Sequence, residues 1–172
     1  MAVVESINTI GYSATSAENT LGALVQVVPA APPSAPTRGE GTSESQLEVL
    51  YEACADDGGS AILAYVLELD RGQGAGFEEV DASLVNTFII NDGTIDSGVT
   101  YTVRYRSQNV HGDSAYSPEL EIIAATVPSE PTAVTVANSV DDSTTTVRVS
   151  WTAPAVYGGD GIPILAYRIL FR

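Results

Sequence analysis

Alternation of apolar and polar side chains is clearest over residues 101–109. One face carries the alternate residues Tyr101, Val103, Tyr105, Ser107 and Asn109. The opposite face carries Thr102, Arg104, Arg106 and Gln108. A period of two, with aromatic and β-branched residues on one side, predicts a half-buried strand. Turn residues follow at 109–113, and a return strand is expected over 114–126.

The same alternation predicts further short strands at 47–51, 62–69, 77–80 and 84–90. Tyr51 and Tyr65 are expected to point inward, and Glu68 is expected to point outward toward Arg104 or Arg106 on the neighbouring strand, in one exposed ion pair. Prolines at 29–36 predict a stiff, extended linker before these strands. These strands, with one more expected before them to make seven, predict an all-β, two-sheet sandwich.

Tyr101 stands three residues after Gly98, at the start of a central strand. A tyrosine there can bury its ring and return its hydroxyl to upstream backbone, as in the tyrosine corner of immunoglobulin-like sandwiches. With the turn from Asn109 to Gly112 and the serine-rich strand start after it, this stretch resembles fibronectin type III modules. That family favours Leu and Pro where Ile95 and Ser97 stand, which makes this corner less rigid.

The resemblance implies an immunoglobulin-like β-sandwich, in tandem modules. It implies that Tyr51 occupies the place of the family's core tryptophan, which Trp151 provides in a following module. It also implies a role in spacing, adhesion or assembly, with sheet faces, edges and loops as contact surfaces. The residues with an expected structural role are Tyr101, Gly98, Trp151, Tyr51, Tyr65 and Tyr167.

Internal repeats support tandem modules. Residues 128–132 repeat 33–37, residues 151–153 match 51–53, and residues 164–167 repeat 62–65. The N-terminal residues 8–18 match 109–119 at a constant offset of 101. The chain is therefore expected to contain the last two strands (F and G) of one module at 1–30, a complete module at 33–127, and the first three strands (A, B and C) of another at 128–172.

A hairpin and an open set of three strands are each marginal in water. We therefore expect a fragment of a longer array, in which each end exposes an apolar face. One face carries Ala2 and Val4, and the other carries Trp151, Tyr167, Ile169 and Phe171. The alternative is that the two ends complete each other between chains. The stretch matching 73–101 is absent from both ends, which disfavours that alternative.

The net charge of −15 comes from 22 acidic residues against seven arginines, with no lysine. This charge disfavours nucleic acid and anionic membrane surfaces as partners, and no apolar run approaches the ~18 residues of a membrane span. The expected partners are proteins, either adjacent modules or copies of the same chain. The lack of lysine and the Thr/Ser/Gly-rich sheets favour an extracellular or cell-surface location. The turn at 57–65 is also similar to modules of giant muscle and cytoskeletal proteins and of protist surface arrays, which keeps a cytoskeletal or ciliary location open.

His111, Asp113 and Ser114 combine the residue types of a nucleophilic triad. A triad needs the histidine between the other two in space, and neighbours in a tight turn point apart, so no catalysis is expected. The turn residues Asn109, His111, Gly112 and Asp113 are instead a candidate interaction loop. Cys54 has no basic neighbour and is expected to be a small, unreactive hydrophobe.

Acidic pairs occur at 56–57, 78–79 and 141–142, and a further acidic residue, Asp160, follows Gly158 and Gly159. They lack the spacing of an EF-hand loop, so no cofactor is expected, and weak calcium binding by acidic loops is the alternative. The sequence thus predicts a non-catalytic structural or adhesive module of a long repeat protein, in a filament or an extended surface array. The other hypotheses are an accessory module of a secreted or surface enzyme and a calcium-stiffened adhesion array.

Overall fold

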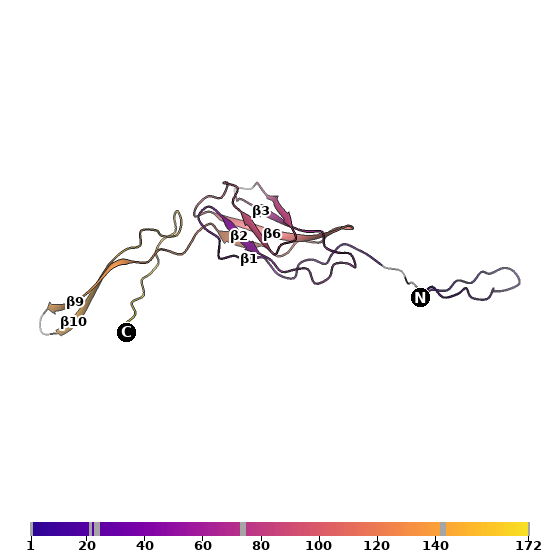
Figure 1. The fold of residues 1–172 in the computed structure, drawn as a ribbon, viewed down its shortest axis with the longest axis horizontal. Coiled ribbons are helices and arrows are strands. Elements are labelled where there is room, and N and C mark those ends of the chain that lie inside the picture. Colours follow the sequence, from indigo (N-terminus) through magenta and orange to yellow (C-terminus); the bar gives the residue numbers. More distant parts are fainter. Residues whose placement is uncertain (1, 21, 23–24, 73–74, 142–143, 172) are drawn as a thin grey trace.

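A computed structural model describes residues 2–20, 22, 25–72, 75–141 and 144–171. Its described elements are ten β-strands, of which eight form a central sandwich and two form a hairpin after it (Figure 1). Residues 2–19 form a second hairpin before the sandwich, with only an isolated bridge between Ile7 and Tyr12. The strands are β1 (Thr37–Arg38), β2 (Leu47–Leu50), β3 (Ala64–Asp70), β4 (Phe77–Ser83), β5 (Thr87–Ile90), β6 (Thr100–Asn109), β7 (Gly112–Asp113), β8 (Leu120–Ile123), β9 (Thr132–Asp141) and β10 (Thr144–Thr152).

The sandwich consists of two antiparallel sheets. One has the order β1-β2-β5, and the other has the order β4-β3-β6-β7, with β8 also pairing with β6. The predicted alternation of β6 is confirmed, because Tyr101, Val103, Tyr105, Ser107 and Asn109 are all buried. Alternation of this kind gives each sheet one apolar face, and the two apolar faces pack together in the immunoglobulin-like, all-β fold.

The core lies between the two sheets and centres on a group of aromatic rings. The ring of Tyr51 lies 4.6 Å from that of Tyr65, 4.9 Å from that of Phe88 and 5.2 Å from that of Tyr105. Burial raises the pKa of the Tyr51 and Tyr105 hydroxyls, and the neighbouring tyrosines add to the effect at Tyr51. Tyr51 thus fills the central position that the resemblance assigned to it.

The expected return strand at 114–126 is broken, which corrects that prediction. Only β7 and β8 form within or beside it. Between them, the Ser114 hydroxyl accepts a hydrogen bond from the Ser107 amide at 3.0 Å, and the Ser117 hydroxyl accepts one from the Tyr105 amide at 3.1 Å. The two hydroxyls replace backbone carbonyls as acceptors for β6, so a regular ladder is not formed there. The strand expected at 84–90 is also shorter, since β5 begins at Thr87.

Residues 2–19 form a hairpin that repeats the serine pairing of β6. The Ser6 amide donates to the Ser13 hydroxyl at 3.0 Å, and the Ser13 amide donates to the Ser6 carbonyl at 2.9 Å. These bonds match those between Ser107 and Ser114, 101 positions later. Val4 is 72% exposed, as expected of an uncovered face.

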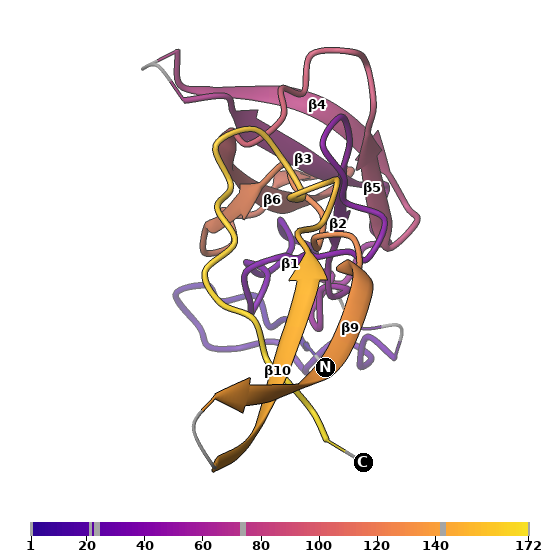
Figure 2. The same cartoon turned by 90° about the vertical axis from the view of Figure 1, so that its left-hand side faces the viewer.

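At the other end, β9 and β10 form a long antiparallel hairpin (Figure 2). The ring of Trp151 lies 5.1 Å from that of Tyr167, which matches the pairing of Tyr51 with Tyr65. The third strand expected in this part is not formed, because residues 162–171 carry no strand assignment. Tyr167 is 41% and Phe171 77% exposed, while Trp151 is half-buried.

Candidate functional site: two junctions and a charged sheet face

The turn before β6, residues 96–99, is named the corner turn. The Asp96 amide donates a hydrogen bond to the Tyr101 hydroxyl oxygen at 2.8 Å, and Tyr101 is 2% exposed. The predicted tyrosine corner is therefore confirmed. Gly98 has a φ of 74°, which favours glycine, and its amide donates to the Ala124 carbonyl at 2.8 Å. Both ends of the corner turn are thus fixed to the sandwich.

Residues 56–60 form a second turn, named the first glycine turn, which contacts the linker that precedes β1. The Val27 amide donates to the Gly58 carbonyl at 2.9 Å, and the Ala30 amide donates to the Asp56 carbonyl at 3.0 Å. Gly58 has a φ of 71°, and a Cβ atom there would overlap the Val27 carbonyl oxygen. Only glycine therefore fits at this position.

The same junction recurs about a hundred residues later, at residues 156–160, named the second glycine turn. The Thr126 amide donates to the Gly158 carbonyl at 2.6 Å, and the Ser129 amide donates to the Val156 carbonyl at 3.0 Å. Here too a Cβ atom at Gly158 would overlap the carbonyl oxygen of its partner, Thr126. The two junctions share two hydrogen bonds and one glycine requirement.

The predicted interaction loop belongs to the first junction. The Asn109 side chain is buried, and its amide group donates to the carbonyls of Val27 and Asp57, each at 2.8 Å. Its oxygen accepts from the His111 amide at 2.8 Å. The structure therefore places Asn109 between the linker and the first glycine turn.

The other members of this loop have different surroundings. His111 Nε2 lies 3.3 Å from Gln26 Oε1, and a Cβ atom at Gly112 would lie 3.2 Å from Val28. Asp113 instead accepts a hydrogen bond from Gln108 at 2.8 Å, on the sheet side of the turn. Asp113 and His111 are thus directed to separate partners, and the structure does not bring them together as a triad would require.

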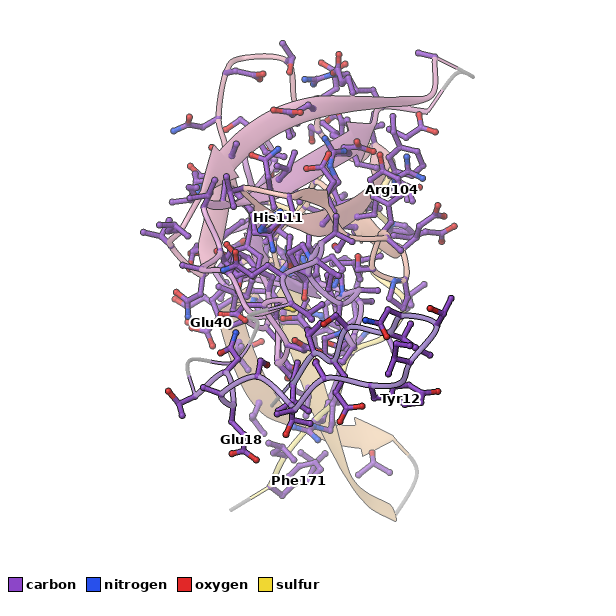
Figure 3. All side chains as sticks on the ribbon, turned by 90° about the vertical axis from the view of Figure 1, so that its right-hand side faces the viewer. Tyr12, Glu18, Glu40, Arg104, His111 and Phe171 are labelled. Atoms are coloured by element: carbon purple, nitrogen blue, oxygen red, sulfur yellow. The ribbon has the colours of Figure 1, made fainter. Side chains whose placement is uncertain are left out.

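The outer face of β3 and β6, with β4 beside it, carries the charged face, centred on Glu68. Nε and Nη2 of Arg104 donate to Glu68 at 2.9 and 2.7 Å, Arg106 forms a second ion pair with it, and the Tyr116 hydroxyl donates at 2.8 Å. The Arg104 guanidinium lies 3.8 Å from the ring centroids of both Phe77 and Tyr116. Figure 3 labels Arg104 on this face and His111 on the turn.

The prediction of an ion pair from Glu68 is confirmed, but the prediction that it is single and exposed is wrong. The Glu68 side chain is only 10% exposed, because the rings of Phe77 and Tyr116 cover the arginines that surround it. Burial alone would raise the pKa of Glu68. The hydrogen bonds from Arg104 and Tyr116 and the charges of both arginines outweigh that effect and hold the pKa below its ordinary value.

Sequence reasoning missed the glycine turns as contact sites. The signal was present, because Gly58-Gly59 and Gly158-Gly159 recur at an offset of 100. A turn explains such glycines equally well, and only the fold brings the linker against them. The sequence could not show that their carbonyls accept hydrogen bonds from the linker.

No group of three or more His, Cys, Asp or Glu side chains that could hold a metal ion occurs among the described residues. Asp142, one of the acidic residues considered for calcium, lies outside them. Cys54 is half-buried, and its thiol lies 2.9 Å from the Asp56 carbonyl oxygen. The described part of the chain includes no helix with the length and apolarity that crossing a membrane requires.

No protein-family model matches the chain. It is 33% identical over 132 residues to human myosin-binding protein C, slow-type, and 27% identical over 159 residues to the human cardiac-type protein. These matches cover 76% and 92% of the chain, but the chain spans only 11% and 12% of those two relatives.

Solved structures also resemble the chain. A human fourth FNIII domain matches with a TM-score of 0.53 and 19% identity, over 66% of the chain and 93% of that domain. The chicken CNTN1 FN1–FN3 domains match with a TM-score of 0.52 and 20% identity, over 74% of the chain and 44% of that structure. At these identities the likeness concerns the fold.

Proposed function

The chain has the fibronectin type III fold, and from this premise we propose that it is a non-catalytic structural module of a long repeat protein, which holds neighbouring modules in an extended array. The observation that carries the proposal is the recurrence of one junction. The same two backbone hydrogen bonds join the linker to a glycine turn at both ends of the sandwich. A contact that recurs about a hundred residues later, with the same kind of turn, is what a regular array requires.

The junctions are built from backbone atoms and glycine, and the charged face is internally paired. Neither offers a nucleophile beside a base, so their chemistry supports spacing and not turnover. The partners that we propose are adjacent modules or copies of the same chain. The head-to-tail arrangement of the two junctions supports this, because a head-to-tail contact that does not close into a ring propagates along the array.

We also propose that the array belongs to a filament or a cell surface. The relatives named myosin-binding protein C support an intracellular filament, and the lysine-free, Thr/Ser/Gly-rich sheets support a surface location. Cell fractionation followed by protease treatment of intact cells discriminates between the two. Degradation in intact cells would support the surface location, and protection would support the filament.

Small-angle scattering from tandem chains tests the array role. The repeat unit of residues 27–125 would be joined in register in increasing numbers, since Thr126 is the counterpart of Val27. The proposal predicts that the maximum dimension rises in proportion to the number of units. A dimension that grows as it would for a compact globule would contradict it.

A further inference from the structure

We propose that the corner turn, residues 96–99, is the docking surface for the glycine turn of the following module, so that the tyrosine corner fixes the angle between successive modules. The proposal deepens the array function and rests on it. It starts from one contact: the Asp160 amide donates a hydrogen bond to the Ser97 hydroxyl at 2.8 Å.

A second observation concerns the neighbouring residue of the corner turn, Gly98. At Gly98 a Cβ atom would overlap the Asp160 carbonyl oxygen. Gly98 therefore needs to be glycine for two reasons: its φ of 74° and the second glycine turn that lies directly against it. Of the described glycines with a positive φ, Gly93 has a similar φ of 82° but nothing within 4 Å of its Cβ position. The close approach at Gly98 thus goes beyond what the local backbone conformation explains.

The docking surface extends from the corner turn to Ala124 and Ala125, the residues that follow β8. Gly159 lies against it, since a Cβ atom there would be 3.2 Å from the Ala125 side chain. Ala125 is held in turn by Arg38, whose guanidinium donates to its carbonyl oxygen. The surface is therefore made of small residues whose positions are fixed from both sheets of the sandwich.

Rigidity of the surface comes from Tyr101. Its hydroxyl accepts from the Asp96 amide, one residue before Ser97. The other side of the turn is bonded to Ala124 in both directions. The Gly98 amide donates to the Ala124 carbonyl, and the Ala124 amide donates to the Val99 carbonyl. Because both ends of the turn are fixed, Ser97 and Gly98 are held in one place. Asp160 can therefore contact them in only one arrangement.

The surface selects a partner of defined chemistry: a turn with glycine at the position of Gly159, which lies against Ala125, followed by a backbone amide that donates to Ser97. The complete module carries the corner turn at one end and the first glycine turn at the other, and Ser60 of that turn stands where Asp160 stands in the next repeat. Here the Ser60 amide donates to the Asp57 carbonyl at 3.4 Å, within its own turn. The contact therefore joins different surfaces of successive modules, so all modules of the array would point in the same direction.

Distances between spin labels test the inference on the full chain. Labels would be attached through Ile89→Cys on β5 and Val136→Cys on β9, both exposed, in a Cys54→Ser background. We expect one narrow distance distribution in the parent. Gly98→Ala should cause loss of that single narrow peak, and Ser97→Ala, which removes the hydrogen bond without an overlap, should broaden it less.

Gly93→Ala is the matched control, because it places alanine at a similar positive φ with open space around it. It should leave the distribution narrow. A broad distribution in the parent, or equal broadening by Gly93→Ala and Gly98→Ala, would overturn the inference. So would narrow distributions in both Gly98→Ala and Ser97→Ala. If Gly98→Ala does not fold, Ser97→Ala alone decides. Tandem chains that scatter as extended arrays despite a broad parent distribution would leave the array function standing.

Discussion

Glu68 on β3 lies directly opposite Arg104 on β6, and both Nε and Nη2 of the arginine donate to the same carboxylate oxygen, Oε2. The Glu68 side chain is largely covered, which distinguishes this pair from an ordinary surface ion pair. Glu68→Gln keeps the shape and removes the charge. It should lower the free energy of unfolding by about 1.5–3 kcal/mol, the range for hydrogen bonds to charged groups.

Denaturant unfolding measures this change, and Glu121→Gln on β8 is the control. Glu121 is exposed, and its substitution makes the same change in net charge. Its effect should lie within about 0.5 kcal/mol of zero. Equal effects of the two substitutions would show that the network around Glu68 contributes only through net charge.

Acid should remove the contribution of Glu68 in a defined direction. The folded state holds the pKa of Glu68 below its ordinary value, so the unfolded chain binds a proton more readily there. The stabilisation is then fully present above the unfolded pKa of about 4.3 and is lost as pH falls through the lower folded pKa. The difference in stability between the parent and Glu68→Gln should be constant near neutral pH and shrink below about pH 4. A difference that grows on acidification would contradict the sign of this shift.

The tyrosine corner predicts a modest loss from Tyr101→Phe. The substitution keeps the buried ring and removes the hydroxyl that accepts from the Asp96 amide. The free energy of unfolding should fall by about 1 kcal/mol, the usual net value of such a bond. Thermal unfolding measures it, and a stability unchanged from that of the parent would show that water replaces the bond without cost.

Replacing the neighbouring serines Ser107 and Ser114 by alanine should have different effects on the free energy of unfolding. Ser114 accepts from the Ser107 amide and donates to the Ala115 carbonyl, so Ser114→Ala should destabilise by about 1–3 kcal/mol. The Ser107 hydroxyl is fully buried with no hydrogen-bond partner in the part of the chain that the structure describes. Ser107→Ala should therefore be neutral or stabilising. Chemical denaturation of the two variants decides, and equal destabilisation would contradict this account.

Much of the fold could be predicted because alternation reports burial directly. β6 shows this best, since every residue expected inward along it is buried. The break after Ser114 could not be predicted, because a serine hydroxyl that replaces a backbone carbonyl leaves the alternation of the sequence unchanged. The burial of Glu68 was missed for a related reason. The covering rings of Phe77 and Tyr116 come from other segments, and a strand read alone does not show its neighbours.

The candidate site was predictable only in part. The sequence singled out Tyr101, Gly98 and Asn109 through their turn chemistry. It could not place Asp160 against Gly98, because that contact joins residues that are 62 positions apart and belong to different repeats. The organisation of the chain into the segments 1–30, 33–127 and 128–172 stays a prediction, which the repeated hydrogen bonds support.

The recurrent junction is the central claim, and amide hydrogen exchange of the full chain tests it most directly. Four amides make the hydrogen bonds of the two junctions: those of Val27, Ala30, Thr126 and Ser129. We predict that all four exchange more slowly than the amide of Val127, which is 84% exposed and lies between the bonded amides of the second junction. Similar protection of Val27 and Thr126, and of Ala30 and Ser129, would confirm that the two junctions are built in the same way. Exchange of all four amides at the rate of an unstructured chain would contradict it.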